Sequence, residues 1–104
     1  MAKDTTAALR LLGLARRAGE LQLGARAVLR ALTREAPGIV FLARDCGADL
    51  RRKMERQRGD SELDAVSFDG QTLAATFGRE RLAVVSVHDA NFVSGLRKAL
   101  YEPR

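Results

Sequence analysis

The feature that most constrains the fold is an unbroken apolar run at residues 39–43, Ile-Val-Phe-Leu-Ala. A Pro-Gly pair precedes the run and an Arg-Asp pair ends it, so it is short and bounded by turn residues. Branched and aromatic side chains in such a run are typical of a strand covered on both faces. We therefore predict a central strand of a sheet at residues 39–43. Binding groups in open α/β sheets collect at the carboxyl ends of strands, so we expect function to begin at residues 44–47.

Helical patterns flank this strand. The first helix is predicted at residues 5–18, with Thr5 or Thr6 as its N-cap and Gly19 at its end. Its apolar stripe is predicted to consist of Leu11, Leu14, Ala15 and Ala18. Gly24 opens the second helix, whose apolar stripe is Ala25, Val28, Leu29 and Leu32.

Strand and helix patterns also alternate through the rest of the chain. Further strands are predicted at residues 20–23, 64–68 and 82–87. In the strand at residues 64–68, Val66 and Phe68 are expected on the same side. A helix at residues 48–58 points Leu50 and Met54 inward. Two more helices begin at the caps Asp69 and Asp89. The helix after Asp69 is predicted to end at Gly78 and to point Leu73 and Phe77 inward. The helix after Asp89 is predicted to point four residues inward: Phe92, Val93, Leu96 and Leu100.

This alternation predicts an α/β sandwich with helices on both faces of a four-stranded sheet. The chain has 104 residues, which suits one domain over residues 1–104. No stretch is long and apolar enough to span a bilayer, and no signal-peptide pattern is present. The one cysteine, Cys46, has no partner for an internal disulfide, so we expect a cytoplasmic protein.

The charge balance favours an anionic partner. Eighteen Lys and Arg residues stand against thirteen Asp and Glu residues, a net charge of +5, and fifteen of the eighteen bases are arginine. Arginine has a planar, forked set of donors that contacts phosphate and stacks on bases, which favours nucleic acid. Charge alone leaves a basic protein without a specific partner equally open.

The arginines of the second helix are a sharper signal. Arg26, Arg30 and Arg34 recur every fourth residue and therefore share one side of the helix. The helix begins at Gly24, so free amide donors and positive charge come together where an anionic backbone could dock. A solvated helix face explains the same spacing, and periodicity alone does not separate the two explanations.

Catalytic signals are sparse. The sequence has no glycine-rich phosphate loop, paired cysteines or histidine cluster. Cys46 and His88 each follow a predicted strand, so a thiol and imidazole pair is conceivable. A small buried hydrophobe for Cys46 and a loop position beside the Asp89 cap for His88 are the simpler explanations.

Several blocks of the sequence resemble a known family. Residues 11–21 (Leu-Leu-Gly-Leu-Ala-Arg-Arg-Ala-Gly-Glu-Leu), Gly24, the strand ending at residues 43–45 and residues 87–92 (Val-His-Asp-Ala-Asn-Phe) look like those of bacterial YlxQ-type proteins. These belong to the kink-turn RNA-binding superfamily of large-subunit ribosomal proteins, the L seven Ae superfamily. The resemblance covers nearly the whole chain in matching order. It implies a three-layer α/β/α sandwich with a mixed four-stranded sheet, no catalysis, and binding of kink-turns, which are sharply bent RNA elements with sheared G·A pairs.

The resemblance also implies where RNA binds. The family's second helix opens with G-x-N-E-x-x-K, in which Asn and Glu contact the G·A bases and Lys contacts the backbone. Here Gly24 and Arg30 match this pattern, whereas Arg26 and Ala27 replace the Asn-Glu pair. Ala27 has no acceptor for a guanine edge, so we predict binding led by backbone charge and shape, with weak kink-turn selectivity. The predicted RNA-binding residues are Gly24, Arg26, Arg30, Arg34, Arg44, Asp45, Arg79, Glu80 and Arg81.

The sequence therefore predicts a non-enzymatic protein that binds structured RNA, either a kink-turn or ribosomal RNA, with the ribosome or the transcription and translation machinery as its setting. We expect no cofactor, metal, membrane partner or small-molecule substrate. Two alternatives remain open: an interaction module of the same fold whose arginines meet an acidic protein, and a small enzyme centred on Cys46 and His88.

Overall fold

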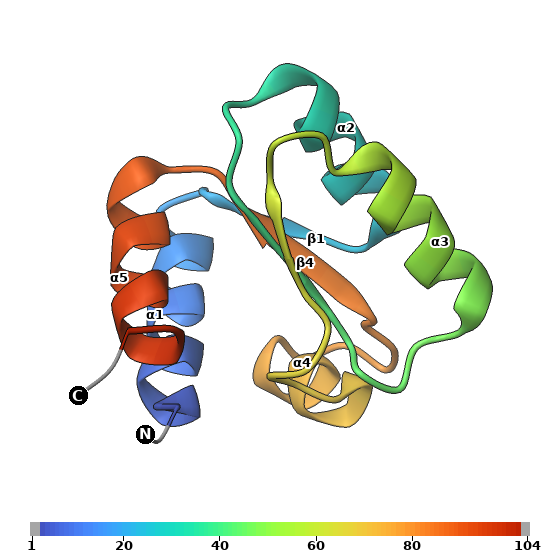
Figure 1. The fold of residues 1–104 in the computed structure, drawn as a ribbon. Helices are drawn as coiled ribbons and strands as arrows, with labels where there is room; N and C mark the ends of the chain where they lie inside the picture. The colour runs from blue at the N-terminus through green and yellow to red at the C-terminus, as the bar shows by residue number, and fades with distance from the viewer. Residues whose placement is uncertain (1–2, 103–104) are drawn as a thin grey trace.

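The computed structural model describes residues 3–102 (Figure 1). Residues 1–2 and 103–104, at the ends of the predicted domain, lie outside this range. The elements in chain order are α1 (Thr5–Arg17), β1 (Leu21–Leu23), α2 (Ala25–Arg34), β2 (Ile39–Leu42), α3 (Ala48–Gln57), β3 (Glu62–Asp64), α4 (Gly70–Thr76), β4 (Val84–Val87) and α5 (Ala90–Leu100). Within the described part of the chain, no helix is long and apolar enough to cross a membrane.

The four strands form one mixed sheet in the order β1-β4-β2-β3. Strand β4 is antiparallel to both of its neighbours, and β2 is parallel to β3. In the register between the two inner strands, Ile39 lies opposite Val87 and Leu42 lies opposite Val84. The predicted central strand is therefore confirmed as an inner strand, although it ends at Leu42, one residue earlier than predicted.

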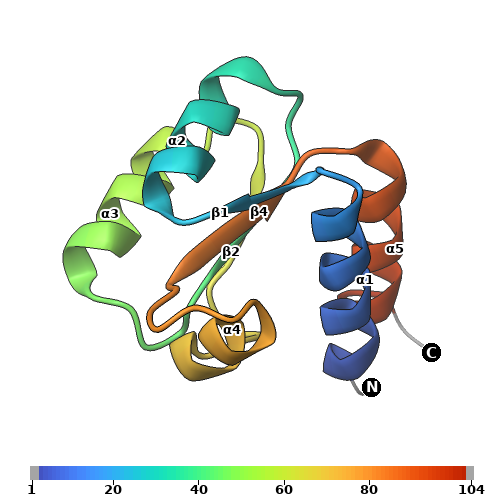
Figure 2. The same cartoon turned by 180° about the vertical axis from the view of Figure 1, so that it is seen from behind.

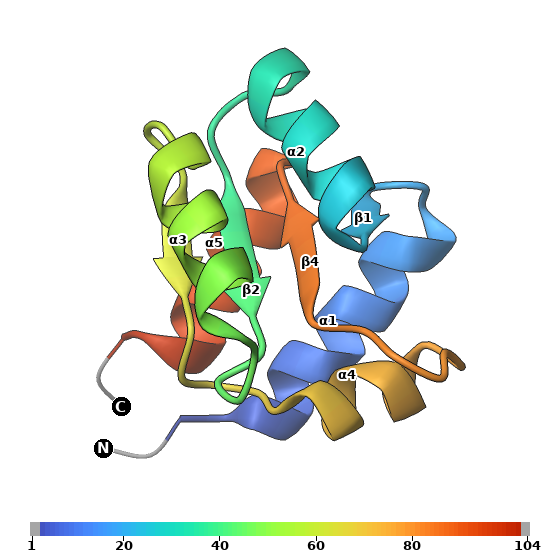
Figure 3. The same cartoon turned by 90° about the vertical axis from the view of Figure 1, so that its right-hand side faces the viewer.

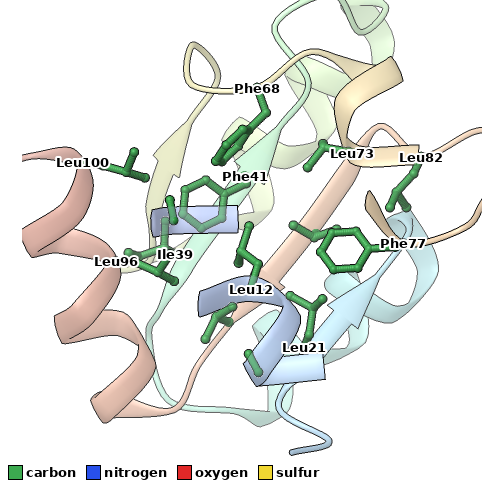
Figure 4. Close-up of a cluster of buried hydrophobic side chains, with 14 of the residues drawn as sticks. Leu12, Leu21, Ile39, Phe41, Phe68, Leu73, Phe77, Leu82, Leu96 and Leu100 are labelled. Atoms are coloured by element: carbon green, nitrogen blue, oxygen red, sulfur yellow. The ribbon is translucent and has the colours of Figure 1, made fainter. Parts of the chain in front are cut away.

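Side-chain alternation along the inner strands divides the core into two clusters. Ile39, Phe41, Val85 and Val87 point to the face covered by α1, α4 and α5, where Phe41 meets Phe68 with ring centroids 5.6 Å apart. Figure 4 shows Ile39, Phe41 and Phe68 in this cluster. Residues of the opposite parity face α2 and α3, namely Val40, Leu42 and Val84, which pack with Val28 and Met54. Figure 3 shows α2 and α3 side by side in front of the sheet, and Figure 2 shows α1 and α5 together on the other face. The three-layer α/β/α sandwich is confirmed.

The start of α1 and its buried stripe differ from the prediction. Asp4, rather than Thr5 or Thr6, is the N-cap, and its carboxylate accepts a hydrogen bond from the Ala7 amide at 2.9 Å. The buried residues are Ala8, Leu12 and Ala15, whereas Leu14 is 43% exposed and Ala18 is exposed. Leucines lie on several sides of this helix, so hydrophobic periodicity does not identify the face that α5 and the sheet cover. Gly19, with a φ of 75°, ends the helix as predicted.

The third strand lies earlier in the chain than predicted. It spans Glu62–Asp64 instead of residues 64–68, and Val66 is 65% exposed while Phe68 is buried, so the two do not share a face. The Asp64 carboxylate accepts hydrogen bonds from the amides of Val66 and Ser67, both at 2.9 Å. This side-chain turn satisfies the two amides locally and ends the strand.

The remaining helices agree with the prediction. Asp69 and Asp89 are N-caps that accept hydrogen bonds from amides of the following turns. Leu73 and Phe77 of the α4 segment are buried, as are Val93, Leu96 and Leu100 of α5. Phe92 packs partly buried against them. On the other face, Ala25, Leu29, Leu32 and Leu50 pack partly buried around Val28 and Met54.

Strand direction decides where the loops meet. β1, β2 and β3 run the same way, because β4 is antiparallel to β1 and β2 and because β2 is parallel to β3. Helices α2, α3 and α4 therefore all begin at the same edge of the sheet, and β4 starts there as well. We call this edge the C-terminal rim. It consists of residues 24–26, residues 44–47, Asp69, Gly70 and residues 79–83.

Candidate nucleic-acid interface

Backbone hydrogen bonds hold three separate segments together at the C-terminal rim. The amide of Gly24 donates to the carbonyl of Val84 at 2.9 Å, and the amide of Ala43 donates to the carbonyl of Ala83 at 2.7 Å. The start of α2 and the end of β2 are thus both attached to the beginning of β4. Residues 79–81, which directly precede this point, are brought next to Gly24 and to the turn after β2.

The turn after β2 is fastened to the start of α4. Asp45 Oδ1 accepts a hydrogen bond from the Gly70 amide at 2.9 Å, and the Arg44 amide donates to the Phe68 carbonyl at 2.9 Å. The Arg44 guanidinium lies 3.3 Å from Asp69 Oδ2, with the Arg44 side chain 52% exposed. Hydrogen bonding from Thr72, together with the Arg44 charge, holds the pKa of the Asp69 carboxyl below its ordinary value. Asp45 therefore positions the rim, and about half of the Arg44 side chain stays exposed.

The surface of the rim is hollowed on both sides of the loop that carries Arg79 and Arg81. A hollow of about 760 Å³ lies between this loop, α4 and the turn after β2, and its lining includes Asp45, Gly47 and Glu80. A smaller hollow of about 250 Å³ lies between the same loop, the start of α2 and α3. Both arginines line both hollows, so they can reach a ligand in either one.

The arginine row of α2 leaves the rim along the helix. Arg26, Arg30 and Arg34 are all exposed, and none forms an ion pair within residues 3–102. Arg26 lies in the first turn at the rim, with Arg30 about 6 Å and Arg34 about 12 Å farther along the axis. The structure thus brings together Gly24, Arg26, Arg44, Asp45, Arg79, Glu80 and Arg81 at the rim. It places Arg30 and Arg34 progressively farther from it.

Two of the helices that begin at the rim have no side-chain cap. Asp4, Asp69 and Asp89 cap α1, α4 and α5, but Gly24 and Gly47 precede α2 and α3 without a capping hydrogen bond. Amides in the first turn of a helix have no intrahelical partner and carry partial positive charge, which favours an anion. Gly47 belongs to residues 44–47, where function was expected to begin, but it was not among the predicted RNA-binding residues. The sequence feature that could have identified the uncapped start of α3 is a glycine, in place of a capping side chain, directly before a helical pattern.

The alternative in which Cys46 pairs with His88 is contradicted by the strand directions. Cys46 follows β2 and His88 follows β4, and because these strands are antiparallel, the two side chains lie at opposite edges of the sheet. The His88 ring is buried with both nitrogens occupied: Nδ1 donates to the Ala36 carbonyl and Nε2 is hydrogen-bonded to Ser86 Oγ, both at 2.9 Å. Cys46 packs against both core clusters. Over residues 3–102, no group of three or more His, Cys, Asp and Glu side chains could hold a metal ion.

Comparison with known proteins identifies the family. The sequence profile of the Ribosomal protein L7Ae/L30e/S12e/Gadd45 family matches residues 6–95, from the first turn of α1 into α5. A solved structure of a protein of unknown function from Bacillus halodurans is similar, with a TM-score of 0.80 and 30% sequence identity over 91% of this chain and 97% of that one. Comparison with curated proteins gives no match. From the profile match over most of its length, the chain belongs to the Ribosomal protein L7Ae/L30e/S12e/Gadd45 family.

Proposed function

We propose that this protein is a non-enzymatic, cytoplasmic RNA-binding protein of the YlxQ type, with one RNA-binding domain over residues 1–104. Its family membership supports a ribosomal-protein-like, RNA-binding function in general. Its partner in this proposal is a structured RNA, either a kink-turn or a segment of ribosomal RNA, met within the ribosome or the transcription and translation machinery. It uses no cofactor and acts on no small-molecule substrate.

The observation that carries this proposal is the convergence of cations and uncapped helix starts at the C-terminal rim. Arg26, Arg44, Arg79 and Arg81 come from three segments and are all exposed there. Two contacts fasten the turn that carries Arg44 to the start of α4: Asp45 accepts a hydrogen bond from the Gly70 amide, and Asp69 forms an ion pair with the Arg44 guanidinium. Phosphate contacts from arginine and from helix amides fix the position and orientation of a nucleic acid, which suits such a surface.

The binding is led by charge and shape because the base-reading pair of the family pattern is absent. Arg26 is exposed in the first turn of α2, where it can meet phosphate, and Ala27 offers no side-chain acceptor. Each bidentate base interaction that the chain cannot make lowers discrimination by about 1–3 kcal/mol. We therefore place weak kink-turn selectivity within the proposal.

The Arg26→Ala/Arg30→Ala double variant tests the proposed surface. It should bind structured RNA more weakly, and the slope of log K against log salt should fall by about one unit for each phosphate no longer neutralised, or about two for the pair. The measurement is a fluorescence titration at several salt concentrations. The matched control is Arg10→Ala/Arg17→Ala, which removes the same charge from exposed positions of α1 on the opposite face. If the first pair binds with wild-type affinity and slope, the proposed surface is wrong.

The replacement of the Asn-Glu pair also favours a second candidate, an interaction module whose arginines meet an acidic protein. Competition separates the two. In the RNA-binding proposal, poly-glutamate displaces structured RNA only at a large excess of charge. Little binding of RNA at physiological salt, together with tight binding of an acidic polypeptide, would favour the module.

A further inference from the structure

The net charge of the chain resides in one layer of the fold. Residues 25–58, from the start of α2 to just past α3, hold nine Lys and Arg residues against four Asp and Glu residues, a net of +5. The remaining residues hold nine of each, a net of zero, which together accounts for the +5 of the whole chain. The layer of α2 and α3 is therefore cationic, whereas the rest of the molecule is balanced.

The cations of this layer lie on its outer surface. On α2, Arg26, Arg30 and Arg34 are exposed above the buried Val28. On α3, Arg52, Lys53 and Arg56 are exposed while Met54 beneath them is fully buried. The two helices lie beside each other on the same face of the sheet, as the views in Figures 1 and 3 both show. We call these six residues the basic layer.

Most of the basic layer forms no ion pair. Arg52 pairs with the exposed Asp49 at 2.6 Å. Within the described part of the chain, the side chains of Lys53, Arg56 and the three arginines of α2 form no ion pair or hydrogen bond. Both helices also begin at uncapped glycines on the C-terminal rim, so the positive ends of their dipoles lie at the same edge. Unpaired cations on neighbouring rigid helices favour a polyanion.

The kind of polyanion follows from what this surface lacks. Neither α2 nor α3 contains an aromatic residue, and single-stranded nucleic acids are held largely by stacking on aromatic side chains. The large hydrophobic side chains that are exposed, Leu14, Val66 and Tyr101, all lie outside these two helices, so the layer lacks the apolar centre of a protein interface. Rows of cations on two helices about 8–10 Å apart suit phosphates presented by a double helix.

We propose that the basic layer binds the phosphate backbone of a double-helical RNA stem that continues from the C-terminal rim. This inference rests on the proposed function and adds α3 to it. Arg52, Lys53 and Arg56 were not among the RNA-binding residues predicted from the sequence. Double-stranded RNA is recognised by shape and by contacts with its phosphates and hydroxyls rather than by its base edges. The layer therefore contributes affinity and orientation without sequence preference.

The Lys53→Ala/Arg56→Ala variant tests the α3 contribution. Both side chains are exposed and alanine favours a helix, so the fold is retained, and thermal unfolding followed by circular dichroism checks it. The probes are an RNA duplex of about 16 base pairs, the extent of stem that double-strand-binding domains span, and one of its strands alone. We expect weaker binding of the duplex, a salt slope lower by about two units, and a smaller change with the single strand. Arg10→Ala/Arg17→Ala is the control that removes the same charge.

The outcomes distinguish this inference from the function on which it rests. If Lys53→Ala/Arg56→Ala keeps wild-type affinity and slope while Arg26→Ala/Arg30→Ala is weakened in both, RNA binds at the rim and α2 only, and the inference fails while the function stands. If the wild-type protein binds neither the duplex nor a structured RNA, the proposed function fails. If poly-glutamate competes with the duplex at equal charge concentration, the layer meets an acidic protein and the inference is overturned.

Discussion

At the scale of single residues, Asp64 is the centre of a hydrogen-bond network outside the rim. The residue is 6% exposed, and its carboxylate accepts hydrogen bonds from Ser67 Oγ at 2.5 Å and Tyr101 Oη at 2.6 Å, as well as from two backbone amides. Burial raises the pKa of this carboxyl, but the hydrogen bonds outweigh burial and hold the pKa below its ordinary value. Burial and the same hydrogen bond raise the pKa of the Tyr101 hydroxyl. The network ties the end of α5 to the end of β3.

Replacing Asp64 with Asn should therefore destabilise the protein in a pH-dependent way. The folded-state pKa is lower than the unfolded value of about 3.9, so the carboxylate contributes its full stability above about pH 4. That contribution is lost as the pH falls through the folded-state pKa. We expect the variant to lose about 1–3 kcal/mol of unfolding free energy at pH 7, and the difference from wild type to shrink below pH 4. Urea unfolding at several pH values measures it.

Asp60→Asn is the control for this change, because Asp60 is an exposed carboxylate in the neighbouring loop. It should follow the wild type at every pH. A difference for Asp64→Asn that stays constant from pH 7 to pH 3 would contradict the role given to the ionised carboxylate.

At the scale of elements, the sequence correctly predicted several features that depend on a few adjacent residues, such as helix caps and helix starts. The Asp69 and Asp89 caps and the Gly24 helix start depend on a few adjacent residues, and all three are confirmed. The α1 stripe could not be read the same way, because the choice between Leu12 and Leu14 depends on packing against α5, which the helix pattern does not contain. The β3 position was missed because Asp64 and Ser67 form a turn where alternation suggested a strand.

The entry into β2 gives a test at this scale. Gly38 is buried, and a Cβ placed on it would lie 1.9 Å from the carbonyl oxygen of Val87. Since this neighbour is backbone of the adjacent inner strand, Gly38→Ala must displace β2 from β4. We expect a loss of about 3 kcal/mol in unfolding free energy, measured by urea denaturation.

Gly13→Ala is the matched control, for which we expect a change in unfolding free energy of opposite sign. Gly13 lies inside α1, and a Cβ there meets no atom within 4 Å apart from its chain neighbours and the backbone of its own helix. The change should stabilise the protein by about 0.5–1 kcal/mol, because alanine loses less conformational entropy in a helix. Equal effects of the two substitutions would contradict the close approach of β2 to β4 at Gly38.

At the scale of the whole molecule, strand direction determines which predicted residues share a surface. Residues 24, 44–45 and 79–81 were grouped from their likeness to a family, and the parallel run of β1, β2 and β3 places them at one rim. The sequence could not exclude the Cys46 and His88 pair, because the antiparallel β4 that separates them is a property of the assembled sheet. Nor did it reveal the α3 half of the basic layer, because the position of α3 beside α2 is a property of the assembled fold.

The central claim is that backbone charge and shape lead RNA binding at the C-terminal rim. The most direct test is to titrate the wild-type protein with a kink-turn RNA and with the same RNA in which Watson–Crick pairs replace the sheared G·A pairs, each over a series of salt concentrations. We predict affinities within about tenfold of each other, a difference of about 1.4 kcal/mol, and the same linear fall of log K with log salt for both RNAs. A preference of about a hundredfold or more for the kink-turn that persists at high salt, or no binding of either RNA, would contradict the account.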